Sequence, residues 1–279
     1  MILQELMDVR VTLDNPLVTE KFNLNIPKIQ INSNEIIGVI GKSGAGKTTF
    51  ARLLAGLLKP ISGTILNNPI NLEIGLSFQF PENQFYMDTI LEDVMLGTID
   101  KKFSDSESQA SAYEALELVN LNPSVYGYRN HMALSGGEKR RAAIATIIAL
   151  KPDLYIFDEP TAALDGIEVR NLIKIMNNIL NQGKTLIIIS QDSGFIAELC
   201  EKLIVFDKGI PVYDGPTIDF YLDTKLTDLY GIEQPPIADF VNSLANNGIN
   251  LNLKSLKITE VNLLLDSYLP SLNAKNPVQ

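Results

Sequence analysis

The chain has 279 residues, 46% of them hydrophobic, which is enough to bury a sizeable core in one large domain or two unequal ones. Its formal net charge is −10 and no run of lysine or arginine stands out, which argues against binding to a nucleic-acid backbone. The single cysteine, Cys200, excludes an internal disulfide and fits a reducing compartment; alternatively it is a small buried apolar residue. The sequence lacks an apolar stretch of about 18 residues and a basic N-terminal region, so we expect a cytoplasmic protein with any membrane role exercised through a partner.

Residues 1–34 alternate apolar and polar side chains, and this period of two predicts antiparallel strands. The apolar run at 36–40 predicts a buried strand, and residues 48–58 carry leucines at helical spacing, which predicts a helix. The stretch GKSGAGKT at 41–48, where this strand and helix meet, fits the phosphate-binding pattern G-x-x-x-x-G-K-[ST].

A strand, a glycine-rich loop and a helix in this order form a cradle for phosphate groups. Glycines let the backbone wrap an anion without Cβ clashes, and the amides of the loop and of the helix start point toward it. Lys47 is expected to reach the β- and γ-phosphates, and the Thr48 hydroxyl to ligate Mg²⁺. A turn that binds nothing is the alternative, and the flanking strand and helix argue against it. The residues expected to hold the nucleotide are Gly41, Lys42, Ser43, Gly44, Ala45, Gly46, Lys47, Thr48 and Thr49.

The middle of the chain predicts a helical insertion between strands. A short strand is expected at 74–78, ending at Gln79. From residue 81 to about residue 134 the pattern is helical but irregular, with one clear helix over 105–119 that stops before an Asn-Pro pair.

The motif Ser135-Gly136-Gly137 stands just before a helix predicted over 139–150. Ser135 and Glu138 fit a capping box, and a helix start of this kind is also an anion site by geometry. The alternative is ordinary capping with a flexible entry. Because the loop described above already provides for one nucleotide, a second anion site about ninety residues along the chain suggests a site completed by another subunit.

Two carboxylates, Asp158 and Glu159, follow an apolar run at 154–157 that predicts a buried strand. A second such strand is predicted at 186–189, and a helix predicted between them at 169–180 implies a parallel α/β sheet. An acid at such a strand end can hold Mg²⁺ through water, and its neighbour can orient or deprotonate an attacking water. We therefore assign Asp158 to the metal and Glu159 to the base; a surface turn is the alternative.

The C-terminal part of the sequence has a different residue pattern from the part before it. Residues 203–206 and 210–213 predict two edge strands joined through a Lys-Gly turn. Beyond residue 215, a proline pair, an Asn-Asn-Gly turn and short apolar clusters predict a small helical appendage. We therefore predict one α/β domain over 1–215, with a helical subdomain inserted at about 81–150, and an appendage over 216–279.

Together and in this order, these motifs resemble the ATP-binding subunit of ABC transporters. The resemblance covers about residues 1–215 and implies a P-loop NTPase (RecA-like) core with an antiparallel β subdomain and a helical signature subdomain, and ATP with Mg²⁺ as cofactors. The matching stretches are Gly41–Thr48 with the Walker A loop, Gln79 with the Q-loop glutamine, Leu134–Glu138 with the LSGGQ signature (Glu in the last position), Leu154–Glu159 with Walker B, and Ala163–Asp165 with the D-loop.

Three further stretches resemble the ATPases of energy-coupling factor (ECF) transporters. They are FQFPENQ at 78–84, similar to FQNPDNQ; EKRRAAIA at 138–145, similar to QKRRVAIA; and residues 231–236 with 247–249, similar to the C-terminal appendage. The resemblance implies an importer of a vitamin or a transition-metal ion. It would combine two ATPase subunits (a homodimer or a heterodimer), a transmembrane coupling protein and a small substrate-binding membrane protein. This chain would be peripheral, at the cytoplasmic face of the cell membrane.

The family arrangement, two ATPases facing head to tail, implies a role for each motif. The residues that would serve one nucleotide are Lys47, Thr48, Asp158 and Glu159, and those that would reach the γ-phosphate held by the other subunit are Ser135, Gly136 and Gly137. Gln79 would contact Mg²⁺ and the γ-phosphate and relay closure to the membrane partner. Residues 84–87 would lie near the groove where that partner docks, or would pack inside the helical subdomain.

Two departures from the family pattern bear on activity. Gln191 stands where the family places a switch histidine, and the only histidine, His131, precedes the signature. Gln191 can donate an N–H to a phosphate oxygen but cannot become cationic, so we expect slower hydrolysis. The family's adenine-stacking aromatic has no counterpart at residues 11–14. Phe22 is either a substitute or a core residue, and weak discrimination between ATP and GTP is expected.

Three alternatives to the ECF interpretation stay open. The chain could serve another ABC importer or exporter, and the proline pair at 235–236 is the feature that discriminates. It could be a soluble ABC ATPase acting on ribosomes or DNA, although the second nucleotide domain or basic patches usual in that class are not visible. It could also be a regulatory subunit that binds nucleotide and hydrolyses it weakly, which Gln191 favours.

Overall fold

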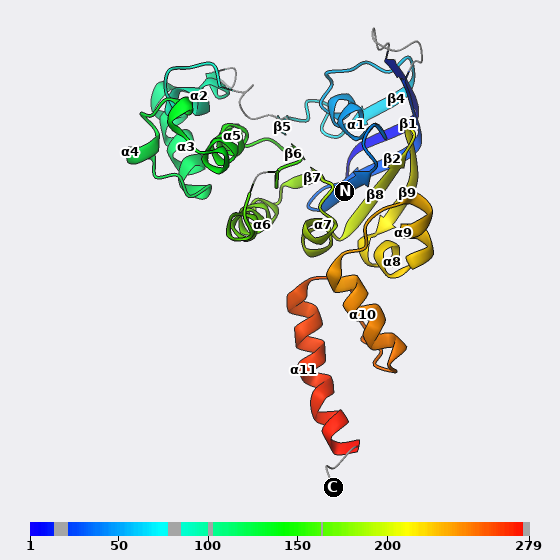
Figure 1. Ribbon diagram of the computed structural model, residues 1–279. Coiled ribbons are helices and arrows are strands. Elements are labelled where there is room, and N and C mark those ends of the chain that lie inside the picture. Colours follow the sequence, from blue (N-terminus) through cyan, green and yellow to red (C-terminus); the bar gives the residue numbers. More distant parts are fainter. Residues whose placement is uncertain (14–21, 78–84, 100–102, 163, 276–279) are drawn as a thin grey trace.

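The computed structural model describes residues 1–13, 22–77, 85–99, 103–162 and 164–275. Two β-sheets form the core, a lobe of helices lies to one side, and the C-terminal helices project from the base (Figure 1). Gln79 and Ala163, two of the residues singled out above, lie outside the described part of the chain. Among the described residues, no helix combines the length and the apolar character needed to cross a membrane.

The first sheet is antiparallel and has the strand order β2-β1-β4. Its alternating side chains bury one face, as the period of two predicts; Leu6 pairs with Ile29 in the register of β1 and β2, and both are buried. The strands are β1 (Ile2–Leu13), β2 (Phe22–Asn32) and β4 (Ser62–Asn67). The predicted antiparallel β subdomain is therefore present.

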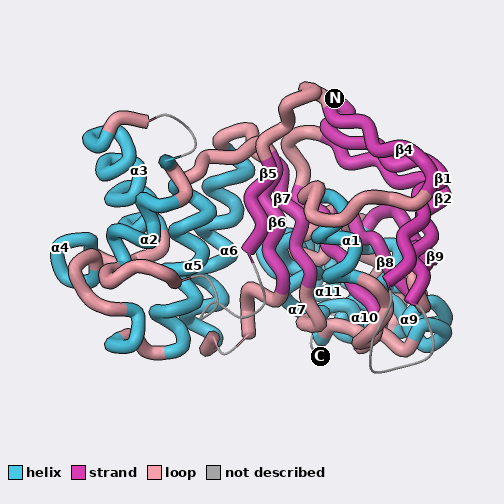
Figure 2. The backbone as a smooth tube through the Cα atoms, turned by 90° about the horizontal axis from the view of Figure 1, so that it is seen from above, coloured by secondary structure: helices cyan, strands magenta, loops and turns pink. Residues whose placement is uncertain are grey.

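The second sheet has the order β5-β6-β7-β3-β8-β9, parallel except for the last strand. Its central strands are continuous apolar runs, as expected for strands covered on both faces. Figure 2 shows them between the helices of the lobe and the antiparallel sheet. The strands are β5 (Ile74–Ser77), β6 (Leu154–Asp158), β7 (Thr185–Ile189), β3 (Ile36–Gly41), β8 (Lys202–Asp207) and β9 (Ile210–Pro216).

One strand assignment from the sequence was wrong. Residues 203–206 were expected at an edge of the sheet, but β8 is an interior strand that pairs with β3 on one side and with β9 on the other. The parallel neighbour β3 comes from more than 160 residues earlier in the chain, so the local pattern of β8 cannot reveal it.

The strand register brings the ends of three strands to one edge of the sheet. Ile189 of β7 pairs with Val39 of β3 on one side and with Asp158 of β6 on the other. The loop after β3, the carboxylates at the end of β6 and the residues after β7 therefore meet in one place, at the carboxyl ends of parallel strands.

Successive side chains of each central strand point to opposite faces of the sheet and enter two separate hydrophobic cores. Ile156 and Ile187 pack with the helix α1 (Lys47–Leu54) and the antiparallel sheet. Phe157 and Ile188 pack with the helices α6 (Gly166–Asn181) and α7 (Ser193–Leu199) and with the lobe. The sheet is thus the shared wall of both cores, which fixes the position of its loops.

Helix α1 ends one turn earlier than the leucine spacing predicts. The chain leaves the helix at Ala55, and Gly56 takes a positive φ of 73° that continues the turn. Leu57 is 58% exposed, so its agreement with the helical period was accidental.

The lobe consists of short helices that begin with side-chain caps. Three of them start with a capping box, in which a Ser or Thr and a Glu three residues later bond each other's backbone amides: Thr89 with Glu92, Ser104 with Glu107, and Ser135 with Glu138. The elements are α2 (Ile90–Leu96), α3 (Asp105–Leu118), α4 (Pro123–Tyr126), the 3₁₀ turn η3 (His131–Ala133) and α5 (Gly136–Ala149). Helix α5 starts three residues before the predicted boundary, because its cap is Ser135.

The C-terminal segment is helical, as predicted. Phe220 and Tyr221 of its first helix are fully buried against the main core. The helices are α8 (Thr217–Leu222), α9 (Thr224–Tyr230), α10 (Pro236–Asn246) and α11 (Ile258–Lys275). We call the segment from α8 onward the appendage.

Candidate nucleotide-binding site

The loop between β3 and α1 is shaped around the ammonium group of Lys47. Lys47 Nζ donates hydrogen bonds to the carbonyl oxygens of Gly41 at 2.7 Å and Lys42 at 3.1 Å. Burial lowers the pKa of Lys47, while the nearby carboxylates of Glu159 and Asp158 oppose that shift. The loop therefore holds the ammonium group of Lys47 at its centre, next to the position that a phosphate group would occupy.

Two glycines of this loop have no room for a side chain. Gly41 has φ 148°, and a Cβ there would overlap the carbonyl oxygen of Phe206. Gly46 has φ 104°, and a Cβ there would lie 2.8 Å from the Phe22 ring. Gly46 is also the N-cap of α1 and offers no side-chain cap, so the first amides of the helix face the loop without a side-chain acceptor. The open backbone at these glycines and the uncapped amides of α1 favour an anion at the helix start.

Thr48 and Asp158 form the second element of the site. Thr48 Oγ1 donates a 2.8 Å hydrogen bond to Asp158 Oδ2, joining the start of α1 to the end of β6. Asp158 is 4% exposed, and burial raises its pKa while the Thr48 bond and the positive charge of Lys47 lower it. A hydroxyl and a carboxylate side by side are oxygen ligands of the kind that Mg²⁺ accepts alongside phosphates and waters. Among the described residues, no group of three or more His, Cys, Asp or Glu is arranged to hold a metal ion.

Glu159 is held in a strained backbone conformation beside Asp158. Its φ of 53° is in the left-handed region, which costs a residue with a Cβ about 1–2 kcal/mol. Its Oε2 accepts hydrogen bonds from the Ser190 hydroxyl at 3.4 Å and from the backbone N–H of Gln191 at 3.3 Å. Burial raises the pKa of Glu159, the Gln191 amide lowers it, and the adjacent Asp158 raises it. The carboxyl group is thus poised to exchange a proton nearer neutrality than an ordinary glutamate.

The contact of Ser190 with Glu159 was not foreseen from the sequence. Ser190 is fully buried at the end of an otherwise apolar strand, and that contrast is the only local signal for it. Gln191, next to it, is exposed, and Asp192 caps the following helix through the amide of Phe195. The backbone amide of Gln191 thus contacts Glu159, the residue that the sequence analysis assigned to the base.

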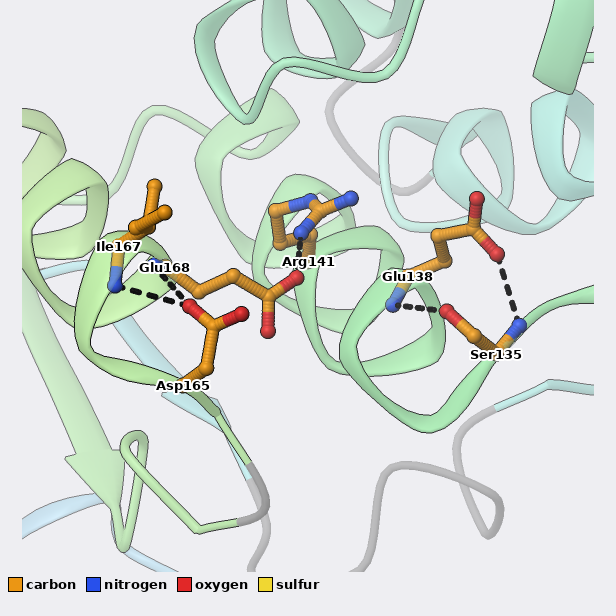
Figure 3. Close-up of polar contacts among 6 residues, drawn as sticks. All are labelled: Ser135, Glu138, Arg141, Asp165, Ile167 and Glu168. Carbon is orange, nitrogen blue, oxygen red and sulfur yellow. Dashed lines mark hydrogen bonds and ion pairs between the residues drawn. The ribbon is translucent and has the colours of Figure 1, made fainter.

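The signature residues lie in the helical lobe, apart from the loop at 41–48 (Figure 1). Ser135 and Glu138 bond each other's backbone amides at the start of α5 (Figure 3). Ser135 and Gly136 are exposed. A Cβ on Gly136 would meet nothing within 4 Å. The structure thus brings the residues of the 41–49 loop together with Asp158, Glu159 and Gln191, and leaves Ser135 and Gly136 of the signature exposed.

A polar contact joins the signature helix to the helix after the D-loop. Arg141 of α5 forms an ion pair with Glu168 of α6 (Figure 3). Asp165 caps α6 by accepting hydrogen bonds from the amides of Ile167 at 2.8 Å and Glu168 at 2.9 Å. The two helix starts are therefore coupled within one chain.

Residue 84 lies outside the described part of the chain, and the three residues after it are partly buried and partly exposed. Phe85 is buried in the lobe, whereas Tyr86 is 76% and Met87 36% exposed. Asp93 holds the segment by accepting hydrogen bonds from the amides of Tyr86 and Met87 at 2.7 and 3.0 Å. The result is an aromatic and a sulfur side chain presented on the surface of the lobe.

Phe22 lies against the nucleotide loop. The half-buried ring packs on the core shared by α1 and the antiparallel sheet and touches the Gly46 position. Residues 11–13 carry no aromatic side chain, and residue 14 is an aspartate outside the described part of the chain.

Comparisons with known proteins agree with this geometry. The family model described as ABC transporter matches residues 24–162. An energy-coupling factor transporter ATP-binding protein, EcfA2, of Clostridium perfringens is 32% identical over 86% of this chain and 89% of its own length. The EcfA2 of Mycoplasmopsis pulmonis is 33% identical over 88% and 90%.

The fold is also that of solved ATP-binding cassettes. The dimeric cassette MJ0796, in a post-hydrolysis state bound to ADP and Pi, superposes with a TM-score of 0.68 and is 26% identical, covering 77% of this chain and 98% of that one. The sequence motifs, the sheet topology and these matches lead to one assignment. The chain belongs to the ABC transporter family and, within it, to the energy-coupling factor transporter ATP-binding proteins.

Proposed function

We propose that the chain binds Mg²⁺-ATP and hydrolyses it to drive an ECF-type importer of a vitamin or a transition-metal ion. The observation that carries this proposal is the joint placement of Lys47, the Thr48–Asp158 pair and Glu159 around one loop. Phosphate groups would be held by the loop residues 41–49. Mg²⁺ would neutralise charge on the phosphates, with Thr48, Asp158 and Gln79 as its candidate ligands.

Glu159 is the group we propose to act on the attacking water. Its carboxylate, once ionised, accepts a proton from that water, and the Ser190 hydroxyl and the Gln191 amide keep it oriented. Gln191 would donate its side-chain N–H to a phosphate oxygen. Lys47 holds the phosphates through charge-assisted hydrogen bonds.

A second ATPase subunit, identical or different, completes each site in this proposal. Ser135, Gly136 and Gly137 would contact the γ-phosphate bound by that subunit, because they are separated from the loop of their own chain. The exposure of Ser135 and Gly136 supports this role. In the same way, the loop of this chain would receive the signature of the second subunit.

The membrane partners follow from the family. The proposed complex contains a transmembrane coupling protein and a small substrate-binding membrane protein, with this chain peripheral at the cytoplasmic face of the membrane. Tyr86 and Met87, the exposed residues of the segment 85–87 on the lobe, form the surface we propose for contact with the coupling protein. Residues 1–215 would form the ATPase domain, with about 81–150 as its helical subdomain, and 216–279 the appendage.

Co-purification and a Glu159→Gln variant test the proposal together. A tagged chain, gently solubilised from membranes of its native host, should bring along an ATPase subunit and two hydrophobic proteins. That complex should hydrolyse ATP, and Glu159→Gln should keep nucleotide binding while lowering kcat by about a hundredfold or more. Glu114→Gln, a surface change in the lobe, is the matched control. Recovery with soluble or ribosomal proteins alone would overturn the proposal.

A weakly hydrolysing regulatory subunit is the second candidate function, because Gln191 cannot carry the charge of a histidine. In this case the better site would belong to the second ATPase of a heterodimer. Gln191→His should then raise single-turnover hydrolysis at the site of this chain by about 10²-fold. An unchanged single-turnover rate would remove the reason for this candidate.

A further inference from the structure

The appendage touches the nucleotide loop at one glycine. Gly231 ends helix α9 with φ 60°, and the side chain of Lys42 lies across it. A Cβ built on Gly231 would stand 2.7 Å from Lys42 Cε and 2.8 Å from Lys42 Nζ. The two residues are 189 positions apart in the sequence, and no local pattern predicts their contact.

A cavity of about 280 Å³ lies at this contact and extends to the position of the switch residue. Gln191 and Glu233 both line it, so the residue at the switch position and an acidic residue of the appendage border one space.

The wall of this cavity on the appendage side is polar as well as buried. Tyr221 of α8 is fully buried, and its hydroxyl has no hydrogen-bond partner in the described part of the chain. With the hydroxyls of Ser43 and Ser193, it makes the cavity a polar space next to the phosphate loop. The appendage is thus in contact with the site rather than remote from it.

We propose that the appendage forms a wall of the nucleotide site in its own chain and that Gly231 positions Lys42. This inference rests on the proposed function, namely that ATP binds at residues 41–49. The absence of a side chain on Gly231 lets the lysine lie over the carboxyl end of α9, where backbone carbonyls favour a cation. Glu233 adds negative charge in the same cavity. Lys42 therefore borders the cavity that Ser43 and Gln191 also line, where its ammonium would strengthen phosphate binding.

The test is an alanine at Gly231, measured against an alanine at Gly248. Both glycines belong to the appendage and have positive φ, 60° and 83°, so both substitutions carry the same kind of backbone strain. Only the methyl group at 231 meets Lys42, since a Cβ at Gly248 has nothing within 4 Å. A difference between the two variants therefore reports the displacement of the lysine.

We expect Gly231→Ala to raise KM for ATP and the Kd for Mg²⁺-ATP about fivefold to tenfold in the assembled complex, with kcat within about twofold. Gly248→Ala should match the parent protein in all three quantities. Lys42→Ala should raise KM to a similar extent, and the Lys42→Ala/Gly231→Ala double variant should show no further rise, because no lysine remains to be displaced. Thermal unfolding of each variant records any change in folding.

Two results would overturn the inference. One is equal KM values for Gly231→Ala and Gly248→Ala; the other is a full additional effect of Gly231→Ala on the Lys42→Ala background. Failure of the proposed function would look different, since the parent complex itself would then fail to bind Mg²⁺-ATP. If the parent complex binds Mg²⁺-ATP and the two alanine variants have equal KM values, the role of Gly231 is contradicted and the proposed function is not.

Discussion

The carboxylate of Glu168 occupies the space that a side chain on Gly137 would need. Both of its oxygens lie 2.6 Å from the position of a Cβ on that glycine. Glu168 is also paired with Arg141 on the same helix as Gly137. The second glycine of the signature is thus a packing surface within the chain, whereas the first, Gly136, faces open space.

This difference predicts opposite consequences for two neighbouring alanine variants. Gly137→Ala should push Glu168 away from Arg141 and lower the melting temperature of the isolated chain by about 2–4 °C. Gly136→Ala should leave the melting temperature unchanged and still reduce ATP hydrolysis by the assembled complex, because its methyl group would meet the nucleotide of the other subunit. Thermal unfolding and steady-state ATPase assays separate the two. Equal melting temperatures for both variants would contradict the packing role.

The ion pair between Glu168 and Arg141 should contribute measurably to stability. The two side chains are 24% and 18% exposed, so water screens them less than a surface pair. Glu168→Gln should lower the free energy of unfolding by about 1 kcal/mol in urea titrations. The control is Glu114→Gln, whose pair with Lys151 is 55% and 52% exposed and should lose about 0.5 kcal/mol or less. If Glu114→Gln lowered the free energy of unfolding as much as Glu168→Gln does, the partial burial of the Glu168–Arg141 pair would not explain its contribution to stability.

The hydroxyl of Ser190 should make a small contribution to the position of the acid limb of the pH–rate profile. Glu159 can accept a proton only above its own pKa, so activity rises with pH through that value. Burial raises the pKa of Glu159, and the Ser190 hydrogen bond is among the contacts that lower it. Ser190→Ala therefore raises this pKa further and moves the acid limb of single-turnover hydrolysis to higher pH. Ser111→Ala removes another buried hydroxyl, which donates to the Ala149 carbonyl at 2.9 Å in the lobe, and should leave the profile in place. A shift to lower pH in Ser190→Ala would be incompatible with this account.

Phe22 should act as a packing residue rather than as a stacking platform for adenine. Its ring rests on Gly46 and on the core, so a leucine at this position keeps much of the contact. Phe22→Leu should therefore change the Kd for ATP by about twofold or less, and competition titrations should show weak preference of ATP over GTP in both proteins. A strong ATP preference that disappears in Phe22→Leu would instead assign the ring to the base.

Local patterns of the sequence were sufficient to predict the strand, loop and helix around residues 41–48, the strand before Asp158 and the cap at Ser135. The contacts that exclude a side chain at Gly41 and Gly46 come from Phe206 and Phe22, which lie elsewhere in the chain. The interior position of β8 depends on pairing with a strand more than 160 residues away, and no short pattern reports it.

Contacts between remote side chains were beyond sequence reasoning for the same reason. Glu168 is an ordinary acid in the first turn of a helix, and such a residue is expected there for its effect on the helix dipole alone. Its contact with Gly137 arises from the packing of α6 on α5. The contact of Lys42 with Gly231 likewise depends on how the appendage folds back on the core.

Strand β7 lies between β3 and β6, so the residues that follow it emerge between the ends of two neighbouring strands. The phosphate loop is anchored on one neighbouring strand and the carboxylates on the other, and Ile189 is paired to both. Position 191, two residues beyond this strand, has its backbone amide on the carboxylate of Glu159 and lines the same cavity as Gly41 and Lys42. We therefore expect a replacement of the Gln191 side chain to change the rate of hydrolysis more than the Kd for the nucleotide.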